Sequence, residues 1–182
     1  MRDTPLAPHP HNHPGDHATL GTSPEPPADL CPTCGGQLDA HHRHVRFQLP
    51  DPVLDVAADE RPARTWGNDV LTQVDGVGAF VRALLPVRLS GGHTLTYGLW
   101  LGVHPDDLRR AHTTWWSPAY PDLVLDGLIA NDVQPWNLLG KPARALVRNP
   151  DETPYVDSSS DAVLNAVLSD EWPHDLVPAT LR

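Results

Sequence analysis

The chain has 182 residues, 40% of them hydrophobic, and its 13 basic and 23 acidic side chains give a formal net charge of −10. This length suits one folded domain with a tail, and a net negative surface disfavours nucleic acids and anionic membranes as partners. No apolar run approaches the roughly 20 residues that span a bilayer, and the first residues lack the apolar segment of a secretory signal. We therefore expect a cytoplasmic protein.

The first part of the chain differs in composition from the rest. Residues 1–30 contain seven prolines and four histidines and almost no apolar side chain to bury. Such a segment cannot offset the entropy cost of becoming ordered. We predict a disordered Pro/His-rich tail over residues 1–29 and a single α+β domain over residues 30–182.

The clearest chemical signal is the run Cys31-Pro32-Thr33-Cys34-Gly35, which is followed by His41, His42 and His44. A Cys-x-x-Cys-Gly turn directs two sulfurs at one point, and thiolate and imidazole ligands suit a tetrahedral zinc ion. We predict a structural zinc knuckle over residues 31–44, with Cys31, Cys34, His41 and His44 as ligands. Three alternatives stay open. His42 replaces a neighbouring histidine, two chains share a site of four cysteine sulfurs, or the turn holds two reduced thiols without metal.

Alternation of apolar and polar side chains, with turn residues between, predicts the elements of the first half of the domain. The expected order is a short strand within residues 44–49, a turn or short helical piece within 53–64, a strand over 70–74, a turn at 75–78, and two long strands over 79–89 and 94–103. Ser90-Gly91-Gly92 joins the two long strands and predicts an antiparallel hairpin at the centre of the sheet.

A helix is expected to follow the hairpin, because Pro105-Asp106-Asp107 is typical of a helix start. Its inner face would carry residues at helical spacing, namely Leu108, Ala111, His112 and Trp115. The remaining expectations are a strand or loop over 123–129, a closing pair of strands over 143–148 and 154–157, and a helix capped by serines 158–160 and stopped at Trp172-Pro173. Together these elements predict an α+β fold with an antiparallel sheet and two principal helices.

The aromatic residues allow two interpretations. Trp115 and Trp116 are adjacent, so on a helix they point about 100° apart, and one should be buried while the other lies at the surface. Trp100, Trp116 and Trp136 either line an aromatic pocket or, as we favour, pack in the core.

Catalytic signatures are few. His104 with Asp106 or Asp107 is either a catalytic pair or, more commonly, a helix cap. The sequence lacks a G-x-S-x-G elbow, an H-E-x-x-H motif and a phosphate-binding loop.

A set of short motifs runs through the domain. The motifs are Cys31-x-x-Cys34-Gly35, Phe47-x-Leu49-Pro50, Gly78-x-Phe80-Val81-Arg82, Pro86-Val87, Tyr97-Gly98-Leu99-Trp100-Leu101, Asp107-Leu108 and Gly127-Leu128. Together with a tryptophan in the helix and a final amphipathic helix, they make residues 31–175 resemble a bacterial family called domain of unknown function 2199 (DUF2199). The resemblance implies no activity, because none is established for that family. In the family a histidine follows the Cys-Gly turn closely, whereas Leu38 and Asp39 stand there in this chain.

From these features we expect a non-catalytic protein-binding module with a structural zinc knuckle and a partner that is a basic protein. The competing interpretation is a small metal- or carboxylate-dependent hydrolase with an aromatic cleft. A binding module should expose an apolar patch, whereas an enzyme should have a deep pocket with converging ionisable groups. The sequence does not indicate an oligomeric state.

Overall fold

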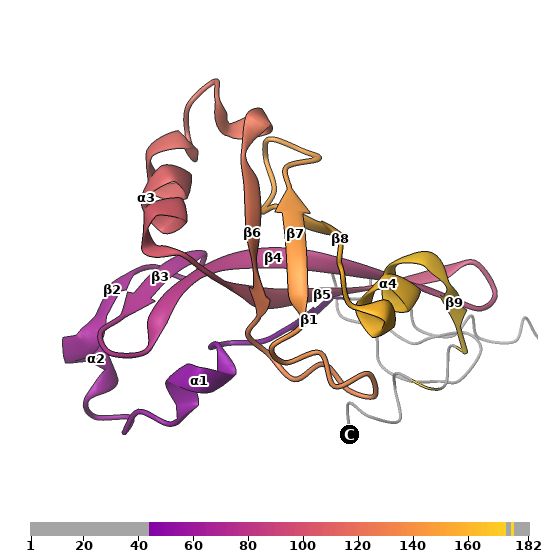
Figure 1. The fold of residues 1–182 in the computed structure, drawn as a ribbon, viewed down its shortest axis with the longest axis horizontal. Helices are drawn as coiled ribbons and strands as arrows, with labels where there is room; N and C mark the ends of the chain where they lie inside the picture. Colours follow the sequence, from indigo (N-terminus) through magenta and orange to yellow (C-terminus); the bar gives the residue numbers. More distant parts are fainter. Residues whose placement is uncertain (1–43, 174–175, 177–182) are drawn as a thin grey trace, which may run out of the picture.

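Five strands hydrogen-bond in a closed circle at the centre of the molecule. The computed structural model describes residues 44–173 and residue 176. The circle consists of β4 (Gly78–Leu89), β5 (His93–Val103), β6 (Val124–Ile129), β7 (Pro142–Leu146) and β8 (Tyr155–Ser158), and β8 pairs back onto β4. The predicted central hairpin is confirmed as β4 and β5, which run across the length of the molecule (Figure 1).

The pairing directions correct the expectation of an antiparallel sheet. Successive neighbours from β4 to β8 are antiparallel, but β8 pairs with β4 in parallel, at Leu84 and Tyr155. A ring of five strands must contain one parallel pair, because alternating directions cannot close over an odd number. The sheet is therefore mixed, within an α+β fold.

Four short strands extend this barrel. They are β1 (His44–Arg46), parallel to β5; β3 (Leu71–Val74), antiparallel to β4; β2 (Thr65–Gly67), antiparallel to β3; and β9 (Glu171–Trp172), parallel to the end of β4. The predicted turn at 75–78 is confirmed, and it joins β3 and β4 as an antiparallel hairpin. The undecided segment 123–129 is a strand, β6, and the predicted closing pair of strands is β7 and β8.

Two principal helices are present, as expected. They are α3 (Pro105–Thr114) and α4 (Ala162–Ser169). The chain also contains the single-turn helices α1 (Asp51–Leu54) and α2 (Arg61–Arg64) and a 3-10 turn at Tyr120–Asp122. No helix in the described part of the chain is long and apolar enough to cross a membrane.

The helix starts show one confirmed cap and one correction. The Nδ1 atom of His104 accepts a hydrogen bond from the backbone N–H of Asp106 at 3.2 Å, so this histidine caps α3. For α4 the cap is Asp161, whose Oδ1 accepts from the backbone N–H groups of Val163 and Leu164. The predicted serine cap is wrong because Ser159 lies two residues before the cap, where its hydroxyl accepts from the N–H of Asp161.

The main core lies inside the barrel. Alternate residues of β4 and β5 that face inward are at most 8% exposed: Val81, Ala83, Leu85, Val87, Leu95, Tyr97, Leu99 and Leu101. Leu108 and Ala111 of α3 and Trp115, the residue after it, join this core as predicted. His112 does not join them and is exposed, because its position on α3 lies at the border of the buried stripe.

A second, smaller cluster covers the opposite face of the hairpin. Its buried members are Val53, Val56, Val74, Phe80, Trp100 and Ala130. They come from α1 and the second residue after it, from β3, β4 and β5, and from the residue that follows β6. The hairpin is thus buried on both faces, which accounts for its nearly continuous apolar sequence.

Candidate functional site

The predicted zinc ligands Cys31, Cys34 and His41 lie outside the described residues, and so does the side chain of His44, whose backbone begins β1. The alternative ligand His42 lies outside them as well. Among residues 44–173 and 176, no group of three or more histidine, cysteine, aspartate or glutamate side chains could hold a metal ion.

A buried arginine organises the outer face of the hairpin. Arg82 on β4 lies directly opposite Trp100 on β5, and its guanidinium carbon is 4.2 Å from the centroid of the indole ring. Arg82 is only 4% exposed. A cation stacked on an aromatic face in a site shielded from water gains more than the same pair at the surface. We call Arg82, Trp100 and Asn131 the Arg82 centre.

The guanidinium of Arg82 is held by backbone oxygens. Its Nε donates to the carbonyl of Asp69 at 2.7 Å, and its Nη1 donates to the carbonyls of Phe47 at 3.0 Å and Gly98 at 3.2 Å. Burial lowers the pKa of Arg82 to about 10, with a further lowering by Arg46 and an opposing effect of Asp69. The side chain stays cationic at neutral pH and connects the segments around β1, β3 and β5.

Asn131 completes this centre and was not found from the sequence. It is fully buried, and its Oδ1 accepts from the backbone N–H of Trp100 at 2.8 Å. Its Nδ2 donates to the carbonyl of Leu49 at 2.9 Å and to Oδ1 of Asp51 at 2.8 Å. All these partners are distant in sequence, so no local pattern marks the residue. Its contacts fix α1 against the hairpin, which is a structural role.

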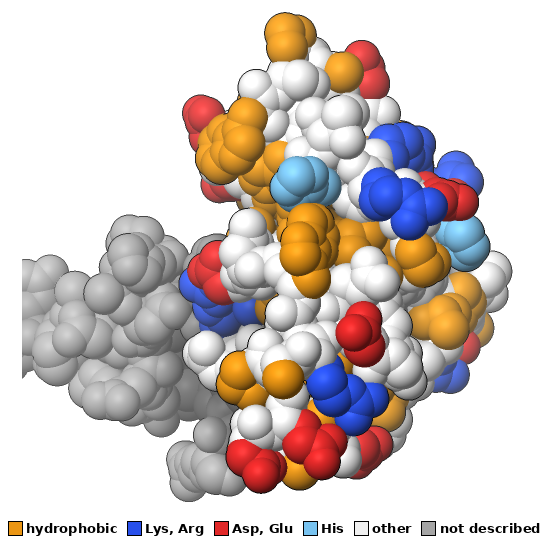
Figure 2. Space-filling view, turned by 90° about the vertical axis from the view of Figure 1, so that its left-hand side faces the viewer, with side chains coloured by type: hydrophobic (Ala, Val, Ile, Leu, Met, Phe, Trp, Pro, Cys, Tyr) orange, Lys and Arg blue, Asp and Glu red, His pale blue; other side chains and the backbone are white. Residues whose placement is uncertain are grey.

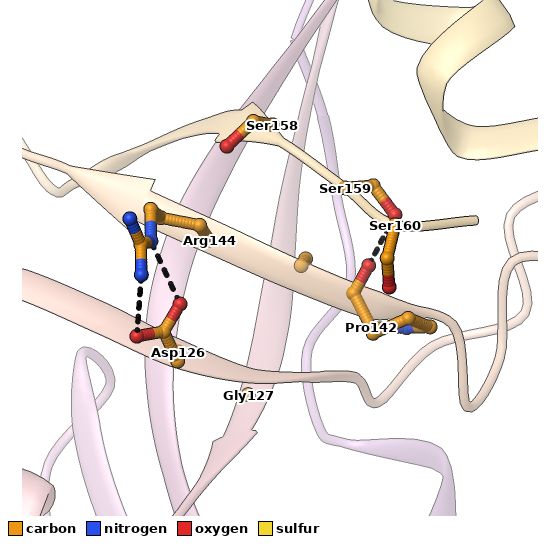
Figure 3. A pocket seen from close by; sticks show the side chains of 8 residues that line it. Asp126, Gly127, Pro142, Arg144, Ser158, Ser159 and Ser160 are labelled. Atoms are coloured by element: carbon orange, nitrogen blue, oxygen red, sulfur yellow. Dashed lines mark hydrogen bonds and ion pairs between the residues drawn. The ribbon is translucent and has the colours of Figure 1, made fainter. Parts of the chain in front are cut away.

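A shallow pocket lies on the outside of the barrel (Figure 3). Its volume is about 290 Å³, and it is lined by Asp126, Gly127, Pro142, Ala143, Arg144, Ser158, Ser159 and Ser160. Figure 3 shows Asp126 and Arg144 paired at one side of it and Ser159 and Ser160 at the other.

The two charged side chains of the pocket form an ion pair with each other. Arg144 Nε and Nη2 donate to the two carboxylate oxygens of Asp126 at 2.8 and 3.1 Å. This bond is the main cause that lowers the pKa of Asp126, and it raises the pKa of Arg144. Ser159 donates to the carbonyl of Pro142 and accepts from Asp161. No histidine or cysteine lines the pocket. A nucleophile paired with a base, which catalysis by a serine requires, is not found among these lining residues.

A second candidate is an aromatic surface formed by β2 and the C-terminal end of α3. Trp116 is 91% exposed and Trp66 is 51% exposed, and the ring centroids of Trp66 and His112 are 5.2 Å apart. His112 lies in the last turn of α3, and Trp116 follows two residues after the helix ends, so both belong to the C-terminal end of this element. We call Trp66, His112 and Trp116 the tryptophan surface. Hydrophobic and histidine side chains gather on this face of the molecule, which carries α2, β2 and α3 (Figure 2).

The tryptophan side chains differ widely in burial. Trp115 is 9% exposed and packs against Tyr120, while Trp116 is exposed, so the expected division between the two is confirmed. Trp100 and Trp136 are buried at 1% and 7% exposure, which confirms core packing for these two residues, but core packing is wrong for Trp116, which is 91% exposed. The alternative of a pocket shared by Trp100, Trp116 and Trp136 is wrong. Trp66 could not be found from the sequence, because its strand of three residues is too short to show a pattern.

Comparison with protein families gives one match. The profile of the family described as "Uncharacterized protein conserved in bacteria (DUF2199)" matches residues 30–164. The chain belongs to this family. No curated protein and no solved structure gives a significant match to the chain. The resemblance inferred from the motifs is confirmed, and the matched region includes the predicted knuckle.

In this DUF2199 protein, several of the motifs that carry the resemblance meet in space. Phe80 and Trp100 are both in the smaller hydrophobic cluster, and Phe47 and Leu49 pack against it. Arg82 hydrogen-bonds to the backbone of two of these motifs. The motifs around β4 and β5 therefore describe one structural centre that anchors the segment after β1.

Proposed function

We propose that this DUF2199 protein is a non-catalytic protein-binding module that contacts its partner through the tryptophan surface. The observation that carries the proposal is the 91% exposure of Trp116, together with the half-exposed Trp66 that contacts His112. Tryptophan is strongly enriched among the residues that dominate binding energy at protein interfaces. Exposed aromatic side chains gathered on one face are typical of an interaction site.

Charge supports a basic partner. The described residues 44–173 contain 10 basic and 17 acidic side chains, so this part of the chain has a formal charge of −7. A negative molecule attracts a positively charged protein over long range and repels nucleic acids and anionic membranes. We therefore propose a basic protein as the partner, in the cytoplasm.

The second part of the proposal concerns the metal. Cys31, Cys34, His41 and His44 are proposed to hold one structural zinc ion, because two thiolates and two imidazoles form a complete tetrahedral ligand set. With four protein ligands the ion would have no open position for substrate. Its role would be to stabilise the segment before β1, while binding depends on the tryptophan surface.

The binding proposal is tested by photo-crosslinking of the full-length protein in bacterial cells. A photoreactive amino acid replaces Trp116, and the matched control replaces Leu139, which is 47% exposed. We expect a discrete adduct with a protein of high isoelectric point at position 116 only, and its loss when Trp66 is also changed to alanine. Equal adducts at both positions, or none at position 116, would contradict the proposal.

The zinc proposal is tested by metal analysis. The four tail histidines, His9, His11, His13 and His17, are first replaced by alanine so that they cannot contribute metal. We expect about one zinc ion per chain, lost in the Cys31→Ser/Cys34→Ser variant and retained in the control His112→Ala. A zinc content below about a tenth of an equivalent in the parent protein would refute a structural zinc site.

A further inference from the structure

β2 is the outermost strand at one end of the sheet. The strand order ends with β4, β3 and β2, so β2 (Thr65–Gly67) pairs on one side only among the described residues. Figure 1 shows β2 at the left-hand side of the molecule, next to α2. All three residues of β2 are exposed. An open strand edge of this kind offers unpaired backbone groups to an incoming chain.

The hydrogen bonds on the β3 side show which backbone groups face outward. The N–H of Asn68 donates to the carbonyl of Leu71 at 2.7 Å, and the carbonyl of Trp66 accepts from the hydroxyl of Thr72 at 3.2 Å. In a trans peptide group the N–H and the carbonyl point in opposite directions. The carbonyl of Gly67, opposite the N–H of Asn68, therefore points away from β3. So does the N–H of Gly67, which lies opposite the carbonyl of Trp66.

A strand that added to this edge would meet the tryptophan surface. Strand alternation places the carbonyl of Thr65 on the same open edge as the N–H and carbonyl of Gly67. Side chains directly opposite each other in an antiparallel pair lie on one face, about 4.5–5.5 Å apart. An incoming residue opposite Trp66 would thus lie beside the indole, on the side where Trp66 contacts His112. Backbone pairing and contact with the tryptophan surface would then act together.

The charges around β2 fit a basic segment. Residues 59–75 contain four acidic and two basic side chains. The two basic side chains, Arg61 and Arg64, already donate to backbone carbonyls. Asp59 and Asp75 are exposed, and in the described part of the chain neither forms a salt bridge. β2 itself lacks the lysine or proline that often protects an open edge from pairing.

We propose that the partner binds through an extended basic segment that adds a strand to the free edge of β2. This inference rests on the proposed binding function and specifies its geometry. Backbone hydrogen bonds attach the segment at Gly67, and an arginine or lysine opposite Trp66 lies against the indole ring. A second copy of this chain fits the edge less well, because each copy has a formal charge of −10.

Synthetic peptides and the full-length protein test the inference by fluorescence anisotropy. The probe is a labelled peptide of about nine alternating arginine and valine residues. Successive N–H groups of a strand point to opposite edges, so N-methylation of only the arginine amides or only the valine amides blocks one edge and leaves charge and side chains in place. We expect one methylated peptide to bind at least about tenfold more weakly than the probe, and the other within about twofold.

The position of the bound peptide is checked on the protein. Addition of the probe should slow hydrogen exchange of the Gly67 N–H, followed by NMR, at least about tenfold. Trp66→Ala should weaken binding at least about fivefold. The matched control Leu139→Ala, at a residue that is 47% exposed, should leave the affinity unchanged.

Four results would overturn the inference. They are equal affinities of the three peptides, weak binding of both methylated peptides, no binding of the probe at about 1 mM, and protection of another strand in place of Gly67. Self-association of the protein through β2 without peptide would assign the edge to a second copy and overturn it as well.

The crosslinked adduct at position 116 separates this inference from the proposed function. If the adduct forms but the two methylated peptides bind alike, the binding function stands and strand addition is refuted. If the adduct is absent but the methylated peptides differ as expected, the edge site stands and the proposed function is refuted.

Discussion

The two faces of the long hairpin are buried in different ways. The face inside the barrel packs only apolar and aromatic side chains, such as Leu85 and Leu99, both with no exposed area. The outer face contains Arg82 and Asn131, which are two of the three buried polar residues among those described. Inside the barrel the backbone bonds to itself in the strand ladder, so side chains need only fill space.

The outer face meets irregular chain, and this explains the difference. The segments that cover it, around Leu49, Asp69 and Asn131, are outside strands and cannot pair their carbonyls in a ladder. Arg82 and Asn131 supply the donors that these carbonyls need. Stability of the inner face should therefore depend on volume, whereas stability of the outer face should depend on particular hydrogen bonds.

The largest effect is expected for Arg82→Ala. It leaves the carbonyls of Phe47 and Asp69 without the donor that Arg82 supplies, leaves Gly98 with only the N–H of Phe47, and removes the contact with Trp100. We therefore expect a loss of about 4 kcal/mol in the free energy of unfolding. Urea denaturation measures it. Arg88 lies on the same strand and is exposed, so Arg88→Ala should cost less than about 0.5 kcal/mol. Equal losses in the free energy of unfolding for the two changes would contradict the prediction that hydrogen bonds of Arg82 stabilise the outer face.

The inner face is tested by Leu99→Ala, with an expected loss of about 3 kcal/mol. Leu99 has no exposed area, and its truncation leaves a cavity in the core inside the barrel. Leu99→Met, which conserves volume, should cost less than about 1.5 kcal/mol, whereas Arg82→Met should remain severe. Thermal unfolding is measured for Leu99→Ala, Leu99→Met, Arg82→Ala and Arg82→Met. It decides whether stability depends on volume at the inner face and on hydrogen bonds at the outer face. If both methionine variants were equally mild, the distinction would fail.

Gly127→Ala should cost about 2 kcal/mol. A Cβ atom at Gly127 would lie 2.3 Å from the carbonyl oxygen of Gly102, so β5 and β6 would have to separate. Gly98→Ala is the matched control on the outer face, where the nearest atom to a new Cβ is Cγ of Arg46 at 3.6 Å, an ordinary contact. Denaturant midpoints should fall for Gly127→Ala only. An unchanged midpoint for Gly127→Ala would show that β5 and β6 can move apart at this position without loss of stability.

A smaller and pH-dependent effect is expected at the start of α4. A hydrogen bond from Lys141 at 2.8 Å, followed by those from the backbone of Leu164 and Val163, lowers the pKa of Asp161 below its usual 3.8. Because the pKa is lower in the folded than in the unfolded protein, the carboxylate stabilises the fold at neutral pH. This contribution is lost as the pH falls through the folded-state pKa.

Lys141→Met measures this contribution. The variant should unfold at lower urea concentration than the parent at pH 7, and the difference should shrink steadily as the pH is lowered below about 4. A difference that stays constant over this range would assign the effect to packing of the lysine side chain and not to the carboxylate.

The smallest effect on stability is expected for Trp116→Ala, within about 0.5 kcal/mol, because the side chain is 91% exposed. The same change should abolish crosslinking of the partner from a photoreactive group placed at Trp66. Circular dichroism and urea midpoints check the first expectation. A large loss of stability would mean that Trp116 supports the fold and is not kept for binding.

The sequence by itself determined the elements whose signals are local. Alternation and Gly91-Gly92 predicted the β4–β5 hairpin, and Pro105 with its acidic neighbours predicted α3. The adjacent Trp115 and Trp116 were correctly divided between core and surface by helical geometry alone. The family was also recognisable from short motifs, and it is confirmed over residues 30–164. The zinc ligands Cys31, Cys34, His41 and His44 remain a prediction.

Only the tertiary structure decided the closure of the barrel and the contents of its outer face. The parallel pairing of β8 with β4 joins Leu84 to Tyr155, and Asn131 bonds to Leu49 and Trp100, residues far away along the chain. Trp66 comes within reach of His112 only because β2 folds back beside α3. Periodicity reports which side of an element is buried, but it carries no information on which distant segment will cover that side.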